Sequence, residues 1–215
     1  RQAAAESFKE ANQIGTQLLG EKHLIMSLFS GRHATVLSNL GKTNEAMTML
    51  EAALENVGSI QGENFILVGN LAHTLGGIAS SVGDFPTAEN SFRRAVQVYT
   101  KHLEVNESEL YLKQYRQSIL RLSVALTMQG KYRKAVTALG PLVDRYGKEL
   151  ENYPEITQRY AFLLLHPEKP ELTNNDFAVR NILRDPVSAF HGAIKYAKAV
   201  KLMREKNNRP LVTNA

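Results

Sequence analysis

Three copies of a pattern of small and large apolar residues run through the first 150 residues, and each copy begins at a glycine. An alanine comes five residues after the glycine, a large apolar residue four residues later, and a further apolar residue three residues after that. The copies are Gly41, Ala46, Leu50 and Ala53; Gly83, Ala88, Phe92 and Ala95; and Gly130, Ala135, Leu139 and Leu142. Because offsets of three and four residues share one face of an α-helix, the pattern predicts a helix after each glycine.

A matching helix is predicted before the glycine, again with apolar and small residues on one face. The residues that mark it are Leu75, Gly76 and Ala79 in the second copy and Leu122, Ser123 and Leu126 in the third. Glycine gives the backbone the freedom to turn sharply at the end of that helix. The copies follow one another at spacings of 42 and 47 residues. Each copy therefore predicts a helix pair that buries its apolar faces by stacking on its neighbours.

The stretch Gly41-Lys42-Thr43 has an alternative reading as the end of a phosphate-binding loop. Such a loop requires a glycine five residues before Gly41, where this chain has Val36, and a β-strand ahead of it. The preceding residues show helical spacing instead, with Leu37 and Leu40 on one face. We therefore interpret Gly41 as a turn between two helices.

The second copy resembles the tetratricopeptide repeat (TPR). The matching residues are Leu75, Gly76, Ala79, Gly83, Ala88, Phe92 and Ala95. The long period is similar to that of kinesin light chains, whose repeats have about 42 residues. The resemblance covers about residues 1–150, and it implies an all-α, right-handed superhelix of antiparallel helix pairs, an α-solenoid, with C-terminal capping helices. Gly140-Pro141 departs from the family pattern, and because proline removes a backbone donor we expect a kink or an early end of that helix.

A domain boundary is predicted near residue 150, because two prolines precede it and five follow it. Residues 1–150 form the predicted repeat domain, and 151–184 form a capping or connecting segment with a short helix at about 155–165. Residues 185–215 are expected to form a basic amphipathic helix and a flexible tail. Within the repeat domain we expect a half repeat at 1–20 and repeats at about 22–57, 64–103 and 111–147.

The first residues match only the second half of the pattern, through Ala4, Phe8 and Ala11. The sequence also begins without an initiator methionine, so we expect a fragment or a processed form. An apolar face would remain exposed at this end. We expect more protein upstream, or a partner, to cover it.

Positive charge gathers at the C-terminal end. Residues 1–185 contain 20 Lys+Arg and 20 Asp+Glu, whereas residues 186–215 contain six basic residues and one acidic residue. Three interpretations stay open: a solvated helix end favoured by the helix dipole, contact with an acidic protein or membrane surface, and contact with nucleic acid. No aromatic stacking pattern accompanies the cations. The basic patch consists of Lys195, Lys198, Lys201, Arg204, Lys206 and Arg209.

Few kinds of chemistry are compatible with this composition. The chain contains no Cys, which excludes disulfides, thiolate metal sites and cysteine nucleophiles. The six histidines are scattered, with no zinc-binding helix motif and no nucleophile elbow. We predict no catalytic residue, no cofactor and no metal, and hence a protein that is not an enzyme.

The sequence shows no membrane span and no secretory signal. With a pI near 9.4 and no Cys, it predicts an intracellular protein of the cytoplasm or of an organelle interior, such as a mitochondrion or plastid.

In the tetratricopeptide family the first helix of each pair lines a concave groove, and the resemblance assigns ten residues of this chain to it. They are Thr35, Ser38 and Asn39; Asn70, His73, Ser80 and Ser81; and Gln117, Arg121 and Thr127. This polar set suits hydrogen bonds to an extended peptide or a packed helix; the alternative is that the positions are simply solvated. Only Arg121 matches the clamp with which some members grip chaperone C-termini, so we do not expect such tails as partners.

The sequence thus predicts a non-catalytic protein–protein interaction scaffold or adaptor, or an assembly subunit of a larger complex. It would bind a peptide or helix in the concave groove. The alternative is a nucleic-acid-associated factor that uses the basic C-terminal helix.

Overall fold

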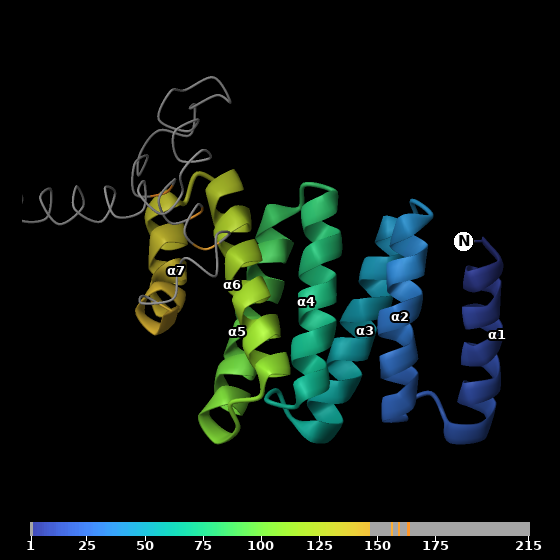
Figure 1. Ribbon diagram of the computed structural model, residues 1–215. Helices are drawn as coiled ribbons and strands as arrows, with labels where there is room; N and C mark the ends of the chain where they lie inside the picture. The colour runs from blue at the N-terminus through green and yellow to red at the C-terminus, as the bar shows by residue number, and fades with distance from the viewer. Residues whose placement is uncertain (1, 147–155, 157–158, 160–162, 164–215) are drawn as a thin grey trace, which may run out of the picture. The chain divides into compact units, whose positions relative to one another are not determined.

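A computed structural model describes residues 2–146 together with 156, 159 and 163 (Figure 1). The chain divides into two compact units, residues 1–129 and 130–215. The described residues contain no β-strand, and the predicted all-α class is confirmed. The helices are α1 (Gln2–Leu19), α2 (Leu24–Asn39), α3 (Thr43–Gln61), α4 (Ile66–Ser81), α5 (Phe85–Val105), α6 (Glu109–Met128) and α7 (Tyr132–Tyr146).

The helices of the first unit alternate between two layers. Helices α2, α4 and α6 lie side by side in one layer, with α3 and α5 behind them in the other (Figure 1). Each helix from α1 to α5 packs against the next one in the chain, and α4 also contacts α2 and α6. This stacking of helix pairs is the α-solenoid that the repeat pattern predicts. None of the described helices combines the length and apolar character needed to cross a bilayer.

The glycines between paired helices end the first helix of each pair. Gly41 and Gly83 have φ angles of 82° and 80°, in the left-handed region that residues with a Cβ rarely adopt. The Gly41 N–H donates to the Ser38 carbonyl at 2.9 Å, and the Lys42 N–H donates to the Leu37 carbonyl at 3.0 Å. Gly83 ends α4 with the equivalent two bonds. These bonds satisfy carbonyls at the helix end, and the interpretation of Gly41 as a turn residue is confirmed.

The small and large apolar residues of the repeat pattern build the core. Ala46, Ala88 and Ala135 have no exposed surface. The same holds for the large residues four positions later, Leu50, Phe92 and Leu139. Burial of each large side chain stabilises the fold by about 1.5–3 kcal/mol, so the pattern marks the positions that hold the helices together. The side chain of Ala4, the fourth predicted equivalent, lies outside the described residues.

Gly76 shows how closely paired helices approach. It faces the ring of Phe92 on α5, and a Cβ added at Gly76 would lie 2.8–3.0 Å from three ring carbons. Phe92 is fully buried, so its ring has little room to move away. Around the neighbouring Gly77 the position of an added Cβ is open space. Only the first of these two glycines is therefore required by packing.

In the second unit, α7 continues through Gly140-Pro141 to Tyr146, so the expected early helix end is wrong, while the alternative of a kink stays a prediction. Gly140 has no Cβ to clash with the proline ring, and the proline removes a single helix hydrogen bond. Residues 156, 159 and 163 are helical, within the helix predicted at about 155–165, and Ile156 and Leu163 are fully buried. The remainder of the capping segment and the predicted C-terminal helix lie outside the described residues.

Gly76→Ala is expected to destabilise the protein by about 1–3 kcal/mol, because the new methyl group overpacks the contact with Phe92. Gly77→Ala on the same helix is the matched control, and it should stabilise the helix by about 0.5–1 kcal/mol. Urea denaturation measures the free energy of unfolding of both variants. Equal changes for the two substitutions would contradict the close contact at Gly76.

Candidate partner-binding surface

The first helices of the pairs expose the same four repeat positions, which we call the first-helix face. Within each helix these positions follow one another at offsets of four, three and four residues, so that they form one stripe. Ten of the twelve side chains are exposed, and Thr74 and Gly77 are half-buried. The face consists of Leu28, Arg32, Thr35 and Asn39 on α2; Asn70, Thr74, Gly77 and Ser81 on α4; and Gln117, Arg121, Val124 and Met128 on α6.

Six of the ten groove residues predicted from the sequence belong to this face. They are Thr35, Asn39, Asn70, Ser81, Gln117 and Arg121. The other four, Ser38, His73, Ser80 and Thr127, are half-buried on the same three helices. The structure thus places all ten on first helices, and their role in binding stays a prediction.

His73 connects two first helices instead of facing solvent freely. Its Nδ1 lies 2.7 Å from the Ser118 hydroxyl on α6, and that hydroxyl donates to the Gln114 carbonyl at 2.8 Å. Because the hydroxyl has one hydrogen, His73 is the donor in the first bond and carries its proton on Nδ1. The imidazole ring also meets the Phe92 ring edge-on. Burial, with a smaller effect of the positive charge of Arg121, lowers the pKa of His73 to about 4.

Asn70 is held in place by the second layer. The buried Tyr99 hydroxyl on α5 donates to Asn70 Oδ1 at 2.8 Å, and burial raises the pKa of Tyr99 well above its ordinary value. The amide oxygen is thereby used within the fold. The Nδ2 group has no hydrogen-bond partner among the described residues, and the residue is exposed. Asn70 therefore offers a partner two oriented donors.

Reasoning from the sequence missed four exposed members of the face. Leu28 and Val124 are each 43% exposed and Met128 is 60% exposed, and Arg32 is exposed as well. The groove prediction, carried over by register from the family, did not include these four positions. The signal was present: each lies 42 residues before, or 47 residues after, a position of the stripe on α4.

Charge separates between the two layers of the first unit. Helices α2, α4 and α6 contain four Lys or Arg residues and one acidic residue, Glu109. Helices α1, α3 and α5 contain seven acidic and four basic residues, and α3 has three glutamates and no Lys or Arg. The helices of the first layer therefore carry a net positive charge and those of the second layer a net negative charge.

Comparison with known proteins identifies the fold. No protein-family model and no curated protein matches the chain. A kinesin-light-chain-like protein of nearly identical TPR-like repeats from Podosopora anserina matches with a TM-score of 0.67 and 16% identity, over 97% of this chain and 89% of its own. A single-substitution variant of that protein gives the same score and identity over 95% and 88%.

A third solved structure, BtubC from P. vanneervenii, has a TM-score of 0.58 and 22% identity over 67% of this chain and 54% of its own. The chain has a TPR-like repeat fold. The resemblance inferred from the second copy is thus confirmed at the level of the fold. In this fold, each helix pair contributes its first helix to the first-helix face.

A metal site and the predicted basic patch are two other candidate sites. Within the part of the TPR-like chain that the structure describes, no three His, Asp or Glu side chains gather as metal ligands. The six cations predicted as a basic patch at 195–209 lie outside the described residues.

The free energy of unfolding should fall by at most about 3 kcal/mol as the pH is lowered from 6.5 towards 4, because unfolded His73 takes up a proton that the folded residue excludes. The stabilisation is complete above the unfolded pKa of about 6.5. His73→Gln, which keeps a donor for Ser118, should remove most of this dependence. Burial also lowers the pKa of His33, so a smaller slope of the same sign should remain. Urea denaturation across this pH range is the measurement, and identical slopes in the two proteins would contradict the assignment.

Proposed function

We propose that the protein is a non-catalytic scaffold whose first-helix face binds a segment of a partner protein. The observation that carries the proposal is the exposed stripe itself, which repeats at equivalent positions of α2, α4 and α6. A TPR-like fold supports protein interaction in general, and the stripe is a surface that all described helix pairs share. In this role the protein serves as an adaptor or as a subunit of a larger assembly.

The chemistry of the face indicates the kind of segment that fits. Arg32 and Arg121 are exposed and have no ion-pair partner among the described residues. Arginine is suited to bidentate contacts with carboxylates. Leu28, Val124 and Met128 add exposed apolar surface. We therefore infer an acidic segment with apolar side chains as the occupant, bound as an extended peptide or as a helix.

Reversal of both arginines, Arg32→Glu with Arg121→Glu, should reduce partner binding at least about tenfold, because each reversal replaces an attraction to carboxylates by a repulsion. Lys101→Glu on α5 is the matched control, since it reverses an exposed charge in the other layer. Partners captured by the full chain from its native cells are quantified for each variant by mass spectrometry. Partners retained by the arginine reversals, or lost equally with Lys101→Glu, would contradict the assignment to this face.

A second candidate function rests on the sequence of the C-terminal segment, where six of seven charged residues are basic. Such a segment favours nucleic acid. In that case binding to a generic duplex should weaken steeply between about 50 and 200 mM salt. Substitution of the six cations by glutamine should abolish this binding and leave protein partners in place.

A further inference from the structure

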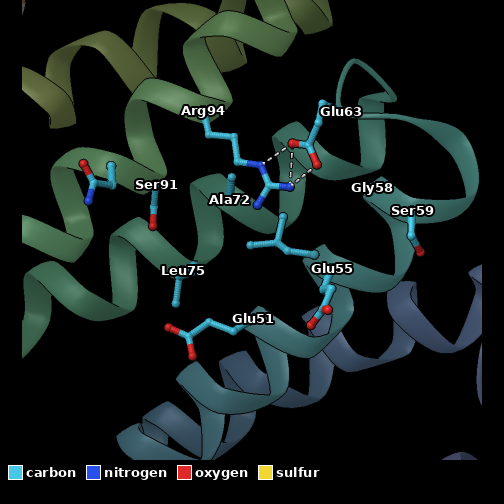
Figure 2. Close-up of a pocket in the computed structure, with 11 residues that line it drawn as sticks. Glu51, Glu55, Gly58, Ser59, Glu63, Ala72, Leu75, Ser91 and Arg94 are labelled. Atoms are coloured by element: carbon cyan, nitrogen blue, oxygen red, sulfur yellow. Dashed lines mark hydrogen bonds and ion pairs between the residues drawn. The ribbon is translucent and has the colours of Figure 1, made fainter.

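A groove opens in the other layer of the first unit, between α3 and α5, with residues of α4 at its floor. Its volume is about 570 Å³. Figure 2 shows Glu51 and Glu55 on the α3 side, Ser91 and Arg94 on the α5 side, and Leu75 between them. The two glutamates are exposed and Leu75 is buried. The groove thus combines an acidic rim with an apolar floor.

An ion pair closes one end of the groove. The Arg94 Nε donates to one oxygen of Glu63 and its Nη2 to the other, each at 2.8 Å, as the dashed lines of Figure 2 show. Gly58 makes room for this pair, because a Cβ there would collide with the Glu63 carboxylate. The positive charge of Arg94 is therefore neutralised and does not repel a cation in the groove.

The acidic rim is not neutralised in this way. Neither Glu51 nor Glu55 has an ion-pair partner among the described residues. The two residues stand one helical turn apart, so their carboxylates flank the same stretch of the groove. Because α3 has no Lys or Arg of its own, the negative potential at this rim is not offset locally.

Ser91 provides a polar group on the α5 side of the groove. Its side chain lines the groove and the residue is only 7% exposed. Its hydroxyl has no hydrogen-bond partner in the part of the chain that the structure describes. The hydroxyl oxygen is not among the buried atoms without a partner, so it is accessible and can accept a hydrogen bond from an incoming donor.

The same cavity recurs one repeat earlier with different chemistry. A pocket of about 1010 Å³ lies between α1 and α3, and seven of its lining residues stand 42 positions before lining residues of the groove. In that pocket Lys9 takes the place of Glu51, and Met49 takes the place of Ser91. The repeat therefore supplies the cavity, and of these two described cavities only the groove between α3 and α5 has both Glu51 and Ser91.

We propose that this groove binds a lysine-bearing segment of a partner protein, independently of the first-helix face. A lysine ammonium group has three donors, and the groove offers three acceptor groups, the carboxylates of Glu51 and Glu55 and the hydroxyl of Ser91. The methylene stem of lysine packs along the apolar floor at Leu75. The rim excludes phosphate-rich ligands by charge repulsion.

The test uses the full chain and a fluorescein-labelled, alanine-rich peptide with lysine at every fourth position, at about 0.15 M salt. Fluorescence anisotropy measures the affinity. Glu51→Gln with Glu55→Gln should weaken binding about tenfold, because both charges of the rim are lost while the side-chain size is kept. Glu10→Gln with Glu109→Gln removes the same charge from exposed positions elsewhere in the first unit and should leave the affinity unchanged.

Three further measurements test the cavity, the lysine charge and the independence from the first-helix face. Ser91→Met copies the residue of the preceding repeat and should weaken binding by filling the cavity. The same peptide with acetylated lysines should not bind, because it keeps the stem and loses the charge. Arg32→Glu with Arg121→Glu should not weaken lysine-peptide binding, which distinguishes this proposal from the proposed function.

Three results would overturn the inference. The first is failure of the lysine peptide to bind, and the second is equal affinity for the Glu51/Glu55 variant and for its control. The third is displacement of the peptide by spermidine at equal amine concentration, which would indicate a site for free polyamines instead of a protein segment.

Discussion

Close contact between helices through residues with little or no side chain is the constraint on which the rest of the structure depends. Ala46 and Ala88 are completely buried, and Gly76 meets the Phe92 ring at a distance that leaves no room for a methyl group. Interiors packed to this density transmit any change of volume to their neighbours. The spacing of the helices, and with it the alignment of exposed positions from one pair to the next, is therefore set by a few small residues.

Because the repeat spacing is regular, residues at equivalent positions of successive helix pairs line the same face of the first unit. The stripe positions recur 42 and 47 residues apart, so residues far apart in the chain, such as Arg32 and Arg121, become part of one surface. The same repeat places the glutamates of α3 in the other layer. Charge thus separates between the layers although residues 1–185 carry no net charge. Net charge alone conceals this separation, which bears directly on the choice of partners.

The sequence predicted the fold well because the repeat pattern is defined by residues that are only three to five positions apart. Turn glycines such as Gly41 and buried residues such as Ala88 follow from spacing alone, whereas the assignment of groove residues to first helices came from the family resemblance. The sequence does not reveal the roles of His73 and Asn70, since these depend on Ser118 and Tyr99, 45 and 29 residues away. The groove beside α3 was missed for the same reason: its walls come from three helices, and no continuous motif marks it.

The ion pair between Arg94 and Glu63 illustrates how an exposed contact serves binding more than stability. The Glu63 side chain is 62% exposed, and pairs of this kind contribute about 0–1 kcal/mol. Its larger effect is to fix Arg94 at the end of the groove and to neutralise its charge. The free carboxylates of Glu51 and Glu55 then determine the potential that an approaching partner meets. Since the first-helix face lies in the other layer and carries the opposite charge, the two surfaces are proposed to bind partners of opposite charge.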